Sequence, residues 1–259
     1  MSNLKNKRAY ISGGSSGIGR AVAELFIEQG AQVVIADIVD GTNVANEIGA
    51  QYVHCNVADE QSVADSFAKT GEILSGKLDI VVLNAGVGDV GYSLQETEFE
   101  LLEKLTKINQ WGVLYGLKYA PKYMNDGGSI INTSSMAAVL NIPGSGVYSA
   151  GKRAILSMTA MSALELGQRN IRVNAVCPGY VNTALGNSPE EKRFSEVFTA
   201  IGRHAEPKED IAPVYAFLAS SASRYMTGQT IKVDGGMDLG PTEKLLELVT
   251  GSAASPGKK

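Results

Sequence analysis

The sequence has few of the residues that metal centres and disulfide frameworks require. Among 259 residues there are two histidines, His54 and His204, and two cysteines, Cys55 and Cys177. No His/Cys/Asp cluster has metal-ligand spacing, so we expect no metal for chemistry. Each cysteine lies in an apolar, strand-like run, which favours buried free thiols and a reducing, cytoplasmic location over a single disulfide.

The chain also lacks an excess of positive charge and any long apolar run. Lys and Arg number 23 against 27 Asp and Glu, a net charge of −4. No basic field is therefore available for a phosphate backbone, and we expect no nucleic-acid partner. No apolar run reaches the ~18 residues that cross a bilayer. The charged segment 1–8 has no apolar stretch after it, as a signal peptide would. We expect no membrane association.

What the sequence does contain is glycine and a regular alternation of patterns. Its 29 glycines have no short period, so we interpret them as turn residues. Short apolar runs alternate with helical patterns, the clearest of which cover residues 96–124, 147–168 and 208–221. The expected strands are 8–12, 32–37, 52–56, 78–83, 129–134, 171–176 and 230–233. Because helices between strands imply parallel crossovers, the pattern predicts an α/β fold. We expect one doubly wound (Rossmann) domain, with a seven-stranded parallel sheet flanked by helices.

Two segments depart from this alternation. We assign residues 1–240 to the dinucleotide-binding and catalytic domain, and within it 183–207 is too long for the usual connection of about 2–6 residues. Since 183–207 follows the carboxyl end of a strand, we interpret it as a substrate lid, with a plain surface insertion as the alternative. Residues 241–259 form a C-terminal extension. It carries an apolar stripe suited to a neighbouring subunit, then a Gly/Ser/Ala/Pro tail that we expect to be disordered. The stripe consists of Leu245, Leu246, Leu248 and Val249.

A glycine-rich turn joins the first strand to the first helix. Free backbone amides at a helix N-terminus bind anions, and glycine lets the backbone approach a diphosphate closely. A flexible turn is the alternative, but the succession of strand, turn, helix and strand favours a nucleotide. The expected cofactor-binding residues of this turn are Gly13, Ser15, Ser16, Gly17, Ile18 and Gly19.

Asp37 ends the second strand, 18 residues after Gly19. A carboxylate there can accept the ribose hydroxyls of NAD and repels the 2′-phosphate of NADP. Neither the two positions after Asp37, Ile38 and Val39, nor the two serine positions of the turn carry an Arg or Lys that could bind this phosphate. The charge pattern therefore predicts NAD as the cofactor, with a solvent-exposed acid as the alternative.

Tyr148 and Lys152 are four residues apart at the start of a predicted helix, so both lie on one face. A free tyrosine has a pKa near 10 and is a poor base. A lysine ammonium one turn away, together with a nicotinium charge, would lower that pKa. Tyr148 could then exchange a substrate hydroxyl proton while hydride passes to or from the ring. Alone, this spacing occurs by chance in many helices.

Further motifs follow in an order that resembles the short-chain dehydrogenase/reductase family over roughly residues 5–236. After the glycine turn these are Asn84-Ala85-Gly86, Asn109 in the long helix, and Ser135 thirteen residues before Tyr148. Pro178-Gly179 and Val233-Asp234-Gly235-Gly236 complete the set. The resemblance implies a dehydrogenase with catalytic residues Asn109, Ser135, Tyr148 and Lys152.

The resemblance also implies a role for each catalytic residue. Ser135 would hydrogen-bond the substrate oxygen and stabilise its developing charge, while its neighbour Ser134 would satisfy backbone. Lys152 would also hold the nicotinamide ribose. Asn109 would bind a water that links Lys152 to solvent; the alternative is a helix-interior polar residue satisfied by backbone.

For the cofactor, the resemblance implies that Asn84 braces the central strands while Ala85 and Gly86 lie beside the adenosine ribose. Pro178, Gly179 and Val181 would line the nicotinamide, and Thr183 would bond its carboxamide. Where the family commonly has an aspartate against adenine, this chain has Asn56 before Val57. An amide oxygen can still accept that bond. The family's frequent tetramers imply a homotetramer joined through 96–124, 147–168 and the region near the C-terminus.

The substrate pocket should be walled by loops 87–93, 136–146 and 180–204. The first two have Asp89 as their only charge, and Val139, Leu140, Ile142 and Pro143 supply apolar surface. We therefore expect a neutral secondary alcohol or ketone as the small-molecule substrate. An anionic substrate would want paired cations. The candidates in the third loop, Lys192, Arg193 and Arg203, are interpreted as a solvated helix face.

Two other functions are open at this point. A 3-oxoacyl thioester reductase normally uses NADPH and meets an acidic carrier protein, so Asp37 and the net negative charge disfavour it. A nucleotide-binding regulator without chemistry is disfavoured because all four residues of the expected catalytic set are present.

Overall fold

The protein is described from a computed structural model that covers residues 4–88 and 91–251. Seven parallel strands form one sheet in the order β3-β2-β1-β4-β5-β6-β7, so the chain winds outward from β1 first to one edge and then to the other. This confirms the predicted doubly wound fold. The strands are β1 (Arg8–Ser12), β2 (Gln32–Asp37), β3 (Gln51–His54), β4 (Leu78–Leu83), β5 (Met124–Thr133), β6 (Arg172–Pro178) and β7 (Thr230–Val233).

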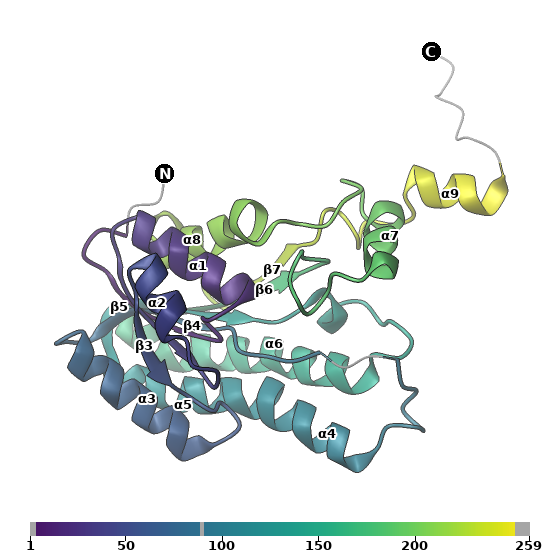
Figure 1. The fold of residues 1–259 in the computed structure, drawn as a ribbon. Coiled ribbons are helices and arrows are strands. Elements are labelled where there is room, and N and C mark those ends of the chain that lie inside the picture. Colours follow the sequence, from purple (N-terminus) through teal and green to yellow (C-terminus); the bar gives the residue numbers. More distant parts are fainter. Residues whose placement is uncertain (1–3, 89–90, 252–259) are drawn as a thin grey trace.

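Helices cover both faces of the sheet, which is why the strands are almost wholly apolar (Figure 1). One face packs against α1 (Gly17–Glu28) and α8 (Ala212–Ala219), with α2 (Thr42–Ile48) beside them. The other packs against α3 (Glu60–Ile73), α5 (Gly112–Tyr123) and α6 (Gly146–Leu166). Successive residues of a strand serve opposite cores: Ile11 and Ile35 belong to the first, Tyr10 and Val34 to the second.

Several boundaries differ from those expected from the sequence. The helix predicted over 96–124 is α4 (Phe99–Leu105), a π-helical segment (Thr106–Trp111) and then α5. The strand predicted over 52–56 ends at His54, because the Asn56 backbone turns to donate to the Ser62 hydroxyl (2.9 Å). In place of 208–221, a π-helical turn (Pro207–Ile211) leads into α8.

The segment after β6 leaves the sheet and returns to it. At its base Ala205 donates to the Tyr180 carbonyl (2.9 Å) and accepts from the Asn182 N–H (2.9 Å). Between them lies α7 (Pro189–Phe198), which begins with a capping box of Ser188 and Glu191. The segment between Tyr180 and Ala205 is thus folded, and hydrogen bonds hold its two ends together.

Beyond β7, α9 (Glu243–Thr250) extends away from the body of the molecule (Figure 1). It carries the apolar stripe, of which Leu248 and Val249 are 67% and 75% exposed. The tail from 252 to 259 lies outside the described residues.

Both cysteines are buried free thiols, as predicted. Within residues 4–88 and 91–251, no helix combines the length and apolar character needed to traverse a bilayer. Nor does that part of the chain bring three or more His, Cys, Asp or Glu side chains together as metal ligands would be.

Candidate active site

The glycine turn after β1 is compact because glycines occupy its crowded positions. Gly13 and Gly17 have φ of +65° and +53°, a region that favours glycine. A Cβ on Gly13 would lie 2.8 Å from the Ala85 Cα, and one on Gly19 would lie 2.1 Å from the Gly13 carbonyl oxygen. The turn is therefore packed directly against the end of β4.

Hydrogen bonds fix this turn to the neighbouring strands. The Ser12 hydroxyl accepts from the Asn84 N–H (3.0 Å) and the Ala85 N–H (3.2 Å). The Asn84 amide donates to the Gly13 carbonyl (3.2 Å) and accepts from the Thr133 hydroxyl (3.2 Å). Asn84 thus connects β1, β4 and β5 at their carboxyl ends.

The turn has the polar groups that a dinucleotide requires. The Ser15 Oγ is buried and has no hydrogen-bond partner in the described part of the chain. The Asp37 carboxylate reaches the same turn, where it accepts from the Ser15 N–H (3.1 Å) and from the Val39 N–H (3.1 Å). An unpartnered hydroxyl and a carboxylate at a helix N-terminus fit a ligand that carries both phosphate and ribose hydroxyls.

Asn56, the residue expected to bind adenine, is not a fully free hydrogen-bond acceptor. The Asn56 Oδ1 accepts the Ala58 N–H (3.0 Å), which closes a local turn. One lone pair of this oxygen is therefore engaged within the chain, and a base would have to use the other.

Ser135, Tyr148 and Lys152 converge at the carboxyl ends of β5 and β6. Tyr148 and Lys152 lie in the first two turns of α6, and the Tyr148 hydroxyl is hydrogen-bonded to Ser135. The Lys152 Nζ lies 5.8 Å from the centroid of the Tyr148 ring and donates to the Thr133 carbonyl (3.2 Å). The lysine is only 4% exposed. The structure thus brings the three side chains into one cluster.

Burial dominates the protonation of this cluster. It raises the pKa of Tyr148 above its ordinary value, against the opposing effect of the Ser135 hydrogen bond. It lowers the pKa of Lys152 to about 8. In the chain by itself the pKa of Tyr148 is therefore raised, and loss of water is the largest cause. The lowering expected from Lys152 together with a nicotinium charge stays a prediction.

Asn109 lies in the π-helical segment and is fully buried. Its Oδ1 accepts the Val87 N–H (2.9 Å) and its Nδ2 donates to the Val87 carbonyl (2.9 Å). The side chain is thus satisfied by backbone and holds the loop after β4. A Cβ on Gly86 would lie 3.0 Å from this Oδ1 and 3.1 Å from the Lys152 Nζ, so a larger residue there would have to displace both side chains slightly.

Two further residues shape the cluster without a recognisable sequence signal. Thr133 supplies the carbonyl that receives Lys152, and its hydroxyl is bonded to the Tyr215 hydroxyl (2.7 Å). Arg153 donates to the Ala138 carbonyl (2.8 Å) and so ties the turn after Ser135 to α6. Ser134 satisfies backbone by donating to the Lys152 carbonyl (2.7 Å).

The residues after β6 lie next to the glycine turn. A Cβ on Gly179 would lie 2.9 Å from the Asp234 Cα, so this position too needs glycine. Val181 is buried, and the Thr183 Cγ2 lies 3.5 Å from where a Gly17 Cβ would be. The segments expected to hold the diphosphate and the nicotinamide are therefore neighbours.

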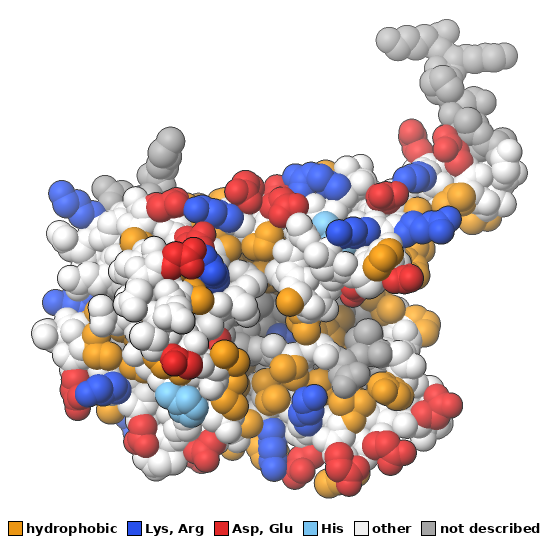
Figure 2. Space-filling model, in the orientation of Figure 1, with side chains coloured by type: hydrophobic (Ala, Val, Ile, Leu, Met, Phe, Trp, Pro, Cys, Tyr) orange, Lys and Arg blue, Asp and Glu red, His pale blue; other side chains and the backbone are white. Residues whose placement is uncertain are grey.

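The expected substrate walls meet through small residues. Leu185 packs against Gly88, whose Cβ would lie 3.2 Å from the leucine Cδ1. Gly91 donates to the Gly144 carbonyl (2.8 Å). Figure 2 shows a hollow between α7 and the helices below it, with hydrophobic side chains along its rim. Asp89 lies outside the described residues.

The three cationic side chains of segment 183–207 differ in whether they are paired with a carboxylate. Arg203 is paired with Asp210 (2.6 and 2.9 Å), while Lys192 and Arg193 are exposed on α7. Arg203 is therefore engaged by Asp210 in an exposed ion pair.

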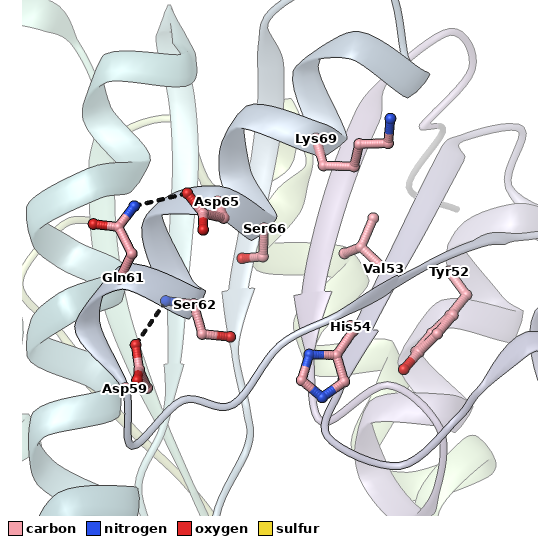
Figure 3. A pocket seen from close by; sticks show the side chains of 9 residues that line it. All are labelled: Tyr52, Val53, His54, Asp59, Gln61, Ser62, Asp65, Ser66 and Lys69. Carbon is pink, nitrogen blue, oxygen red and sulfur yellow. Dashed lines mark hydrogen bonds between the residues drawn. The ribbon is translucent and has the colours of Figure 1, made fainter.

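An open pocket of about 640 Å³ lies elsewhere, between the edge strand β3 and α3 (Figure 3). His54 and Tyr52 line it from β3, and Asp59, Asp65 and Lys69 line it from the start and body of α3. None of the predicted site residues lines this pocket, so we do not assign it to the reaction.

Comparison with known proteins extends these observations. A family model described as "Enoyl-(Acyl carrier protein) reductase" matches residues 13–238. The chain is 35% identical to the mitochondrial borneol dehydrogenase of Lavandula x intermedia, over 92% of this chain and 93% of that protein. It is 36% identical to secoisolariciresinol dehydrogenase of Forsythia intermedia, over 91% and 90%. Among solved structures, a blue fluorescent protein from a metagenomic library, in complex with NADPH, superposes with a TM-score of 0.85. It is 31% identical and covers 91% of this chain and 99% of that one.

Proposed function

The chain belongs to the short-chain dehydrogenase/reductase family, and from this premise we propose that it is an NAD-dependent enzyme acting on a neutral secondary alcohol or ketone. The family relation makes it an oxidoreductase that uses a nicotinamide cofactor and a small-molecule substrate. The observation that carries the finer proposal is the cluster of Ser135, Tyr148 and Lys152, in which a buried lysine lies beside two half-buried hydroxyl groups.

NAD would be held along the carboxyl edge of the sheet. The amides of the glycine turn and the Ser15 hydroxyl would bind the diphosphate, and Asp37 would accept the adenosine ribose hydroxyls. The bound nicotinamide supplies or accepts the hydride. A related structure holds NADPH, so the choice of NAD rests on the Asp37 charge and on the absence of a cation at Ile38 and Val39.

The chain's own residues would manage the proton. Tyr148 would pass it to or take it from the substrate oxygen, and Ser135 would donate a hydrogen bond to that oxygen. Because burial raises the pKa of Tyr148, its phenolate needs a positive charge close by. Lys152, with a pKa of about 8, is mostly protonated at neutral pH and supplies one. Asn109 would hold the loop after β4 in register with the lysine.

Two features support a neutral alcohol or ketone. Hydrophobic side chains lie along the rim of the hollow, and Arg203 is already paired with Asp210. The two relatives are named as dehydrogenases of borneol and of secoisolariciresinol. We further propose segment 183–207 as the substrate lid, a cytoplasmic location supported by the two free thiols, and a homotetrameric assembly.

The test follows nicotinamide absorbance with purified protein, NAD or NADP, and a panel of secondary alcohols. We expect reduction of NAD but not of NADP. Tyr148→Phe should abolish turnover while it still binds NAD, and Tyr225→Phe, which alters a fully exposed tyrosine, should leave turnover unchanged.

Each other outcome points to a different function. Preference for NADPH with a 3-oxoacyl thioester would favour the thioester reductase. Tight NAD binding without turnover of any alcohol or ketone would favour a nucleotide-binding regulator.

A further inference from the structure

His204 is a buried histidine for which the proposed reaction gives no role. It lies in residues 199–207, the part of segment 183–207 that follows α7, and is only 8% exposed. Its Nδ1 is 2.7 Å from the Ser195 Oγ of α7, and its buried Nε2 has no hydrogen-bond partner within residues 4–88 and 91–251. A buried polar atom without a hydrogen-bond partner costs free energy, so the position of this imidazole calls for an explanation.

The Ser195 hydroxyl determines which ring nitrogen carries hydrogen. The hydroxyl donates its one proton to the Lys192 carbonyl (2.8 Å), so it acts as acceptor toward the ring. The His204 Nδ1 therefore bears the hydrogen and donates it to Ser195. This bond joins α7 to residues 199–207, which follow it in the chain.

On its other side the imidazole lies against Tyr180, with ring centroids 5.7 Å apart. Tyr180 follows Pro178-Gly179, the segment expected to line the nicotinamide, and its carbonyl accepts the Ala205 N–H (2.9 Å). His204 is thus wedged between α7 and the exit of β6.

We propose that His204 is a positioning residue that holds α7 over the substrate through its Nδ1 bond to Ser195 and its contact with Tyr180. This rests on the proposed function, in which 183–207 is the lid. A neutral, apolar substrate gains most of its affinity from burial. A lid helix released from its anchor would therefore weaken substrate binding, while NAD binding and the proton transfer would persist.

Two substitutions of His204 distinguish the roles of its two ring nitrogens. The side-chain amide of Asn can place a donor near the Nδ1 position, and that of Gln near the Nε2 position. We expect His204→Asn, which keeps a donor toward Ser195 but lacks the ring that contacts Tyr180, to raise KM for the alcohol less than about twofold. His204→Gln and Ser195→Ala should raise KM for the alcohol about 5- to 10-fold, the loss of one buried hydrogen bond. Both should leave kcat and the NAD Kd within about twofold. The control is His54→Gln at the exposed end of β3, which should change nothing.

A second measurement does not depend on turnover. Amide hydrogen exchange of α7 without substrate should become faster in His204→Gln and Ser195→Ala, but not in His204→Asn or His54→Gln. Unchanged exchange in the first two variants would overturn the proposal, as would equal effects of Asn and Gln. Faster exchange with an unchanged KM would overturn the positioning role. If the unaltered protein oxidised no alcohol, the proposed function would fail, while hydrogen exchange would still decide whether His204 holds α7.

Discussion

Lys152 combines a position in the proposed reaction with a cost to folding. It is almost fully buried, and this lowers its pKa from 10.5 to about 8. The unfolded chain binds this proton more tightly than the folded one between these two values. The contribution of Lys152 to the free energy of unfolding therefore rises as pH increases from about 8 to about 10.5.

The prediction compares the unaltered protein with Lys152→Met by urea unfolding at both ends of this pH window. The unaltered protein should gain roughly 3 kcal/mol relative to the variant, at about 1.4 kcal/mol for each unit of the pKa shift. Lys69→Met, which alters an exposed lysine, is the matched control. A pH dependence that is the same in all three proteins would contradict the buried charge.

Asp37 is the residue on which the choice of cofactor depends. Its two carboxylate oxygens accept the Ser15 and Val39 N–H groups. Asp37→Asn can keep one acceptor but removes the charge, so the ratio of kcat/KM for NAD to that for NADP should fall about tenfold or more. Asp40→Asn, three residues on and exposed, should leave the ratio unchanged. An unaltered ratio in Asp37→Asn would place cofactor selection elsewhere.

At the scale of elements, α6 and the turn after β5 must keep a fixed distance for Ser135 to meet Tyr148. Arg153 holds them together by donating from Nε to the Ala138 carbonyl (2.8 Å) and from a guanidinium nitrogen to the Val139 carbonyl (3.4 Å). Lysine cannot reproduce this two-point contact.

We therefore expect Arg153→Lys to lower kcat about tenfold while the NAD Kd stays unchanged. Arg169→Lys is the matched control, because Arg169 likewise binds the carbonyls of Pro121 and Met124, but beside the start of β5 and remote from the cluster. Both variants should lose some stability, and only Arg153→Lys should lose rate. Equal kcat in the two would show that Arg153 has no part in positioning.

The sequence was informative wherever one element carried the whole signal. Apolar runs located all seven strands, and the glycine turn could be recognised because its neighbours in the chain are also its neighbours in space. The π-helical segment at Asn109 was missed, since helical periodicity hardly changes across a single wider turn. The end of β3 was predicted two residues too late, because the turn at Asn56 depends on a hydrogen bond to Ser62 in the next helix.

The sequence predicted which residues would lie together in the proposed site, but it did not predict their electrostatics. Spacing placed Tyr148 and Lys152 on one helix face, and the structure agrees. The direction of the tyrosine pKa depends on how much water the assembled loops exclude, which no local pattern records. The roles of Thr133, Arg153 and His204 arise from contacts between elements distant in the chain, so no motif could have indicated them.

At the scale of the whole molecule, one helical face keeps large apolar side chains in water. In the described chain these include Leu102, Trp111, Leu114, Met161 and Leu164, which are between 38% and 77% exposed. They belong to α4, the π-helical segment, α5 and α6, all on the same side of the sheet (Figure 1). Large apolar groups gathered on one face favour burial against another subunit.

A second exposed apolar set lies toward the C-terminus of the chain, with Phe217 of α8, Leu239 after β7 and the stripe of α9. Two separate apolar surfaces on one chain can build two kinds of two-fold interface, which is what a tetramer built as a dimer of dimers requires. We therefore expect the protein to sediment as a homotetramer.

A charge placed on one surface should split that tetramer in a defined way. Leu164→Glu puts a carboxylate on the 77% exposed site of α6, and burying it between subunits costs several kcal/mol. Sedimentation velocity should then report dimers held by the second surface, with the fold unchanged by circular dichroism. Val39→Glu, which adds the same charge to a 65% exposed site after β2, should remain tetrameric. A monomeric unaltered protein, or a Leu164→Glu variant that stays tetrameric, would rule out the face of α5 and α6 as the interface.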